Sequence, residues 1–134
     1  MHELPIEQYH RILDALPCYV TLVDPHYRVL WGNEMVRRDF GAPSGKTCYK
    51  LFRLRGGKCS DCPVQKTLKD GQVHSKEMTL TTTQGSRMSV LMHASPLKAS
   101  DGQIIAAIET SVNITSVKEL QKQLILLGQT VAGM

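Results

Sequence analysis

The feature that most constrains this chain is a set of three long alternating segments in its C-terminal half. Apolar and polar residues alternate across residues 73–83, 87–97 and 103–114. A period of two is typical of a strand with one buried face. Ser100-Asp101-Gly102, between the last two segments, favours a tight hairpin turn. We therefore predict three consecutive antiparallel strands.

Two shorter strands and several small helices precede this set. The apolar runs at residues 19–24 and 28–32 flank a proline-containing turn and predict a hairpin. Asn33 fits a helix N-cap, because its side-chain oxygen can accept from a free backbone N–H of the first turn. Short helices are expected at residues 34–40, 47–52 and 63–69. The fold class is therefore α+β, with a five-stranded antiparallel sheet and short helices on one face.

Amphipathic segments flank this core at both ends of the chain. Residues 5–16 have the apolar spacing of one helix face. In residues 116–134 the apolar residues are spaced three and four apart, at Val117, Leu120, Leu124, Leu127 and Val131. This heptad spacing predicts a helix that pairs with its twin, although a helix lying on its own sheet remains an alternative. The organisation is an N-terminal helix (1–17), a central domain (18–115) and an exit helix (116–134).

Charge and hydropathy exclude two classes of partner. The net charge is +4, but the basic residues are scattered and aromatic residues make up only 5% of the chain. No basic stripe with interleaved aromatics appears, so we expect no nucleic-acid binding. No apolar run reaches the roughly 18 residues that span a bilayer, and no signal peptide is visible. We expect a cytoplasmic protein without membrane contact.

Cysteines give the sequence its most distinctive chemistry. Cys59 and Cys62 form a C-x2-C pair, and Cys48 lies eleven residues upstream of the pair. Two thiolates at this spacing can bind one metal from a tight turn. Cys18 is a candidate fourth ligand, and four thiolates suit zinc or an iron–sulfur cluster. For Cys48, Cys59 and Cys62 there are two alternatives, which are disulfide or thiol redox chemistry and a purely structural role. For Cys18 the alternative is a small apolar residue of the core.

A second candidate site is an apolar pocket under the sheet. Methionine fills irregular gaps and can line an adaptable pocket. An ordinary packed core is the alternative for the same residues. The candidate pocket residues are Trp31, Met78, Leu80, Met88, Val90 and Met92.

Several local sequences resemble the PAS family, over roughly residues 8–130. Residues 23–33 look like the family's opening hairpin, and residues 100–103 look like the turn between its last two strands. Residues 112–115 resemble the signature that joins the last strand to the exit helix, with Asn113 in place of the usual Asp. Cys48 and the C-x2-C pair resemble a cysteine-containing PAS variant. The resemblance implies a PAS-like sensory fold.

The C-terminal sequence carries a further resemblance. Residues 127–134 are similar to the segment that precedes the phosphoacceptor histidine in bacterial sensor histidine kinases. This likeness implies a fragment truncated before that histidine. It also implies a two-component system, with a kinase domain in the same parent chain and a downstream response regulator as partners. No ATP-binding motif is present, so we expect the fragment itself to be non-catalytic.

The resemblance argues against two cofactors of related domains. Haem-binding relatives place a histidine in the helix expected here at residues 63–69, which has none. Flavin photoreceptors use a cysteine in an Asn-Cys-Arg setting, and Thr47-Cys48-Tyr49 does not match it.

The expected function is a sensory input domain that detects a small ligand, a metal or a redox state. The signal would pass through Asn113 and Thr115 into a dimeric exit helix, through Val117, Leu120, Leu124 and Leu127. A ligand-free dimerisation module is the alternative. A thiol oxidoreductase using Cys59 and Cys62 has less support, because the order of elements lacks the βαβ setting of such a motif.

Overall fold

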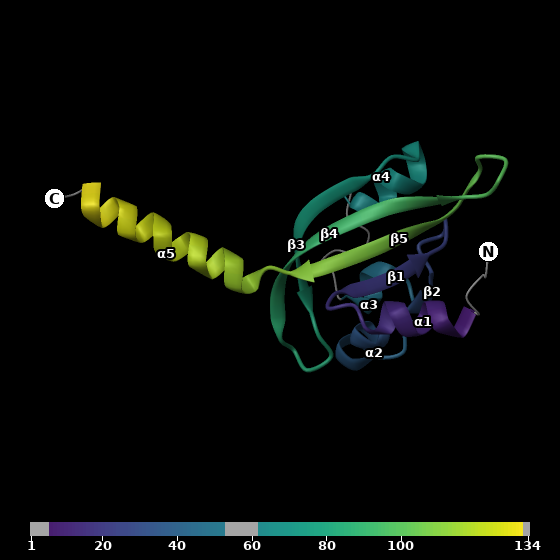
Figure 1. Ribbon diagram of the computed structural model, residues 1–134, viewed down its shortest axis with the longest axis horizontal. Helices are drawn as coiled ribbons and strands as arrows, with labels where there is room; N and C mark the ends of the chain where they lie inside the picture. The colour runs from purple at the N-terminus through teal and green to yellow at the C-terminus, as the bar shows by residue number, and fades with distance from the viewer. Residues whose placement is uncertain (1–5, 53–61, 133–134) are drawn as a thin grey trace.

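The computed structural model describes the backbone of residues 6–52 and 62–132 and the side chains of residues 7–52 and 62–129. Figure 1 shows one sheet with small helices packed around it and a long C-terminal helix. In chain order the elements are α1 (Ile6–Asp14), β1 (Tyr19–Val23), β2 (Val29–Gly32), α2 (Glu34–Phe40), α3 (Cys48–Leu51), α4 (Pro63–Asp70), β3 (His74–Thr81), β4 (Arg87–Lys98), β5 (Ile104–Asn113) and α5 (Thr115–Ala132).

The sheet has the order β2-β1-β5-β4-β3, and every neighbouring pair is antiparallel. The predicted α+β class and five-stranded antiparallel sheet are confirmed. Strand bounds differ from the predicted segments by one or two residues at most ends; most of these ends lie inside the predicted segment, whereas β4 extends one residue further, to Lys98. The last strand in the sequence, β5, lies at the centre of the sheet between β1 and β4.

The two faces of the sheet have different surroundings. We call the face that carries Val23, Val90, Met92 and Ala107 the inner face, because these residues pack in the core with residues of α2, α3 and α4. The opposite, outer face carries α1 over its β1 side, where Leu13 lines a groove with Val20, Leu22 and Ile108. The small helices therefore cover one face, as the sequence predicts.

The side chain of Asn33 forms hydrogen bonds with several elements. Its Oδ1 accepts from the Val36 amide at 3.3 Å, which confirms the predicted N-cap of α2. The same oxygen accepts from the Val20 amide of β1 at 3.1 Å. Its Nδ2 donates to the carbonyls of Leu13 and Cys18, each at 2.9 Å. Asn33 is fully buried, so one side chain joins the end of α1, the start of β1 and the start of α2.

The two terminal helices differ from their predicted extents. α1 ends at Asp14, before Pro17, so Leu16 lies outside the helix and is partly exposed. α5 begins at Thr115 and extends away from the sheet (Figure 1), so it does not lie on the sheet as the alternative reading had it. In the described part of the chain, no helix is both long and apolar enough to cross a membrane.

Candidate functional site

The inner face brings together most of the predicted pocket residues. Leu80, Val90 and Met92 are fully buried, and Met78 and Met88 pack against the same core from partly exposed positions. Strand pairing places them in adjacent rows, because Met78 lies opposite Val90 and Leu80 lies opposite Met88. These five side chains therefore form one continuous apolar surface beneath β3 and β4.

Trp31 lies elsewhere, on the outer face. It pairs with Leu22 and stacks on His10 of α1, with 5.0 Å between ring centroids. The pairing of β1 and β2 shifts register between Leu22 and Val23, and Leu30 is the extra residue. If side chains simply alternated after Val29, Trp31 would lie on the inner face. The bulge places it on the outer face instead. The tryptophan instead lines an apolar groove of about 280 Å³ between α1 and the sheet.

A polar strip crosses the centre of the apolar inner face. Thr21, Glu109 and Ser111 are each at most 2% exposed. Thr21 lies opposite Glu109 in the sheet, and its hydroxyl donates to Glu109 Oε1 at 2.8 Å. Burial raises the pKa of Glu109 to about 7, and the hydrogen bond from Thr21 opposes this shift. A carboxyl group in the middle of the core therefore changes charge near neutral pH.

Two cysteines border this strip. Cys48 begins α3 and Cys62 precedes α4, and both cysteines are buried. Burial, followed by the nearby Glu109 and Cys62, raises the pKa of the Cys48 thiol well above its usual range. Cys18 lies just before β1 and is half-buried, and its thiol pKa is also raised by burial. Such thiols hold little thiolate, which is the form that binds metals and attacks disulfides.

The predicted metal site is only partly within the described residues. Cys59 lies outside the residues that the structure describes. Among residues 7–52 and 62–129, no group of three or more His, Cys, Asp or Glu side chains could hold a metal ion. Cys18, Cys48 and Cys62 therefore do not form a zinc or iron–sulfur site by themselves.

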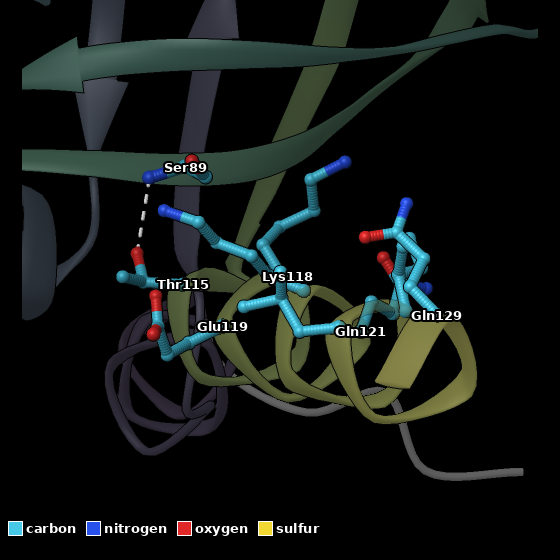
Figure 2. A pocket seen from close by; sticks show the side chains of 9 residues that line it. Ser89, Thr115, Lys118, Glu119, Gln121 and Gln129 are labelled. Atoms are coloured by element: carbon cyan, nitrogen blue, oxygen red, sulfur yellow. Dashed lines mark hydrogen bonds between the residues drawn. The ribbon is translucent and has the colours of Figure 1, made fainter. Parts of the chain in front are cut away.

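The junction between the sheet and α5 is closely hydrogen-bonded. We call Ser89, Asn113 and Thr115 the exit junction. The Ser89 amide donates to Thr115 Oγ1 at 3.0 Å, as Figure 2 shows, and the Thr115 amide donates to Asn113 Oδ1 at 3.0 Å. One turn later, Lys118 Nζ lies 2.9 Å from Glu77 Oε2 of β3. The start of α5 is thus tied to both β4 and β3.

Beyond this junction, α5 presents apolar side chains to solvent. Four of the predicted heptad residues are 52 to 60% exposed: Val117, Leu120, Leu124 and Leu127. The side chain of Val131 lies outside the described set. The groove of about 510 Å³ between α5 and β4 is lined by residues that include Ser89, Lys118, Gln121 and Gln129 (Figure 2).

Comparison with known proteins agrees with this architecture. A family model described as PAS fold matches residues 13–119. The chain belongs to the PAS fold family. No curated protein sequence matches it significantly.

Solved structures of low sequence identity share the fold of this PAS domain. An RNA-binding light-oxygen-voltage receptor superposes with a TM-score of 0.77 at 16% identity, over 99% of this chain and 42% of the receptor. The PAS domain of Bordetella pertussis BvgS gives 0.59 at 20% identity, over 92% and 97% of the two chains. The PAS domain of a Colwellia psychrerythraea protein gives 0.64 at 12% identity, over 83% and 98%. The chain thus spans less than half of the first of these proteins.

Sequence reasoning missed the polar strip of this PAS domain. The run Ile104 to Ile108 draws attention to its apolar residues, and Glu109 directly follows it. Alternation along β5 was nevertheless available as a signal, since Ala107, Glu109 and Ser111 must share one face. Ile104, Ala106 and Ile108 make the other face at least as apolar, so alternation alone did not show that Glu109 lies on the core side.

Proposed function

We propose that this PAS domain is the sensory input module of a two-component sensor histidine kinase, which passes a change beneath its sheet to a dimeric exit helix. The observation that carries the proposal is the continuity of β5 and α5. β5 holds the centre of the sheet and the buried Glu109, and a single residue, Ile114, separates it from α5. A shift in the packing of the inner face therefore has a short covalent route out of the domain.

The exit junction supplies the coupling between sheet and helix. The Ile114 amide donates to the Ser89 carbonyl at 2.8 Å, and the Ser89 amide donates to Thr115 Oγ1. These two bonds are on the backbone of β4, which also carries Val90 and Met92 of the inner face. A displacement of β4 relative to β5 must stretch or realign these bonds, so the first turn of α5 moves with them.

A second copy of the chain is the proposed partner of α5. Exposed leucines at heptad spacing gain free energy when they pack against an identical helix, since about 0.8 kcal/mol is gained for each buried CH₂ group. The kinase context is supported by the likeness of residues 127–134 to the segment before a phosphoacceptor histidine. The kinase domain of the parent chain and a response regulator are the further partners in this proposal.

The buried thiols give less support to a thiol oxidoreductase. Catalytic cysteines of that class need a lowered thiol pKa and access to solvent. Cys62, one of the two cysteines that this hypothesis uses, is only 5% exposed.

The pairing of α5 is tested by measuring the solution mass of the chain by light scattering. We expect the mass of two chains for the wild type and of one chain for the double variant Leu120→Lys, Leu124→Lys. The matched control is Gln121→Lys, Gln123→Lys, which adds the same charge to α5 outside the heptad positions and should keep the mass of two chains. An unchanged mass for the leucine variant would contradict the proposed dimer and with it the route of the signal.

A further inference from the structure

The polar strip of the inner face has fewer partners than its burial requires. Glu109 accepts one side-chain hydrogen bond, from Thr21. The Ser111 hydroxyl, next on the same face of β5, is buried without a hydrogen-bond partner in the described part of the chain. Buried polar groups are almost always paired, and an exception calls for an explanation. The strip is therefore incomplete as a purely structural feature.

Among the residues that the structure describes, no cationic side chain forms an ion pair with Glu109 that would hold it ionised. From β1 the same face carries Thr21 and Tyr19, and the Tyr19 hydroxyl donates to Asp39 of α2. β4 contributes the apolar Met92 and Ala94, and its His93 lies on the outer face, bonded to Ser75 and Ser95.

The helices and the far strand complete the set of described groups that face Glu109. α3 contributes the Cys48 thiol, which is close enough to interact with the Glu109 charge, and Cys62 at the start of α4 lies near Cys48. His74 and Lys76 of β3 share the inner face, but β4 separates them from β5. Burial and the Thr21 hydroxyl are accordingly the two causes that set the Glu109 pKa.

We propose that Glu109 is a proton-binding site and that its protonation is a signal that this domain reads. The inference rests on the proposed function, since it names the signal for the same route. In the protonated state the neutral carboxyl group fits the apolar inner face. When the carboxyl O–H bond breaks and the proton leaves to solvent, the remaining carboxylate requires water or new donors. The contacts of β5 with α3 and α4 must then loosen.

The position of Glu109 gives this change a route to the exit helix. It lies opposite Thr21 of β1 and Ala94 of β4, so it lies at the centre of the sheet. Asn113 of the exit junction lies four residues later on the same strand and on the same face, opposite Val90. A local rearrangement at Glu109 is therefore transmitted along one strand to Asn113 and Thr115.

Nuclear magnetic resonance titration of the 134-residue chain tests the inference. We expect the Glu109 carboxyl carbon to titrate with a midpoint of about 7. We expect the amide signals of Ser89 and Thr115 to shift with the same midpoint. Glu109→Gln, which keeps the shape and the acceptor for Thr21, should abolish the amide shifts. Glu7→Gln, an exposed glutamate of α1, is the matched control and should retain them.

Thr21→Val provides a second variant that keeps the carboxyl group. Removing the hydroxyl donor should raise the Glu109 midpoint further, because that hydrogen bond favours the charged form. Ionisation of Glu109 near the usual glutamate pKa of about 4.3 would overturn the inference, as would junction shifts that persist in Glu109→Gln. Titration of Glu109 without any response at Ser89 and Thr115 would also overturn it. The mass measurement on α5 is independent of all these outcomes. It tests the proposed function separately.

Discussion

The buried carboxyl group predicts an unusual dependence of stability on pH. Glu109 has a pKa of about 7 in the folded chain, against an ordinary value of 4.5. Because the folded state binds the proton more tightly, the stabilising contribution is complete below about pH 4 and is lost as the pH rises through 7. Each pKa unit corresponds to about 1.4 kcal/mol, so the total loss is about 3 kcal/mol. Most of that loss falls between about pH 5 and pH 8.

Urea unfolding at a series of pH values measures this loss. The unfolding free energy of the wild type should fall across the window, whereas that of Glu109→Gln should stay nearly flat. The two proteins should therefore be similar near pH 5, and the variant should be the more stable at pH 8.5. Asp39, whose carboxyl pKa is lowered mainly by Arg38, titrates below the window and does not interfere. Parallel pH profiles for the two proteins would refute the reasoning. Glu7→Gln is the control, because it changes the net charge by the same amount at an exposed position.

Two further measurements test other features of the fold. Gly32→Ala should lower the unfolding free energy by about 1 to 3 kcal/mol through overpacking, because an added Cβ would lie 2.9 Å from Val36 Cγ1. Gly128→Ala on α5, where a Cβ meets no atom within 4 Å, should be neutral or stabilising, and equal losses in both variants would contradict this account. Alkylation followed by mass mapping should label the half-buried Cys18 before the buried Cys48. In urea the two rates should become similar, and faster labelling of Cys48 in the native chain would contradict its burial.

The residues of the inner face were predictable because side chains along a strand alternate between its two faces. The alternation of Met88, Val90 and Met92 fixed one side of β4, and the pairing of β3 with β4 carried the same side to Met78. Backbone geometry enforces this alternation along any paired strand. The N-cap at Asn33 was also predictable, because it too depends on the local sequence alone.

Features that depend on tertiary context were not predictable in the same way. The bulge at Leu30 reversed the side of Trp31, and a single added residue leaves no mark in the composition of so short a strand. The bonds from Asn33 to Leu13 and Cys18 depend on where α1 packs, which the cap signal does not specify. The cysteine spacing predicted ligands, but burial at Cys48, which disfavours the thiolate, became visible only in the folded chain.

The central position of β5 also has a consequence for how the domain folds during synthesis. The β1–β2 hairpin and the β3–β4 hairpin are not paired with each other, and only β5 joins them. Both hairpins must therefore wait until residue 113 has emerged from the ribosome before the sheet can form. Until then each exposes an unpaired edge, which is a hazard for aggregation. The strand that closes the sheet is also the one that continues into α5, so the exit helix emerges directly after the last strand that the sheet requires.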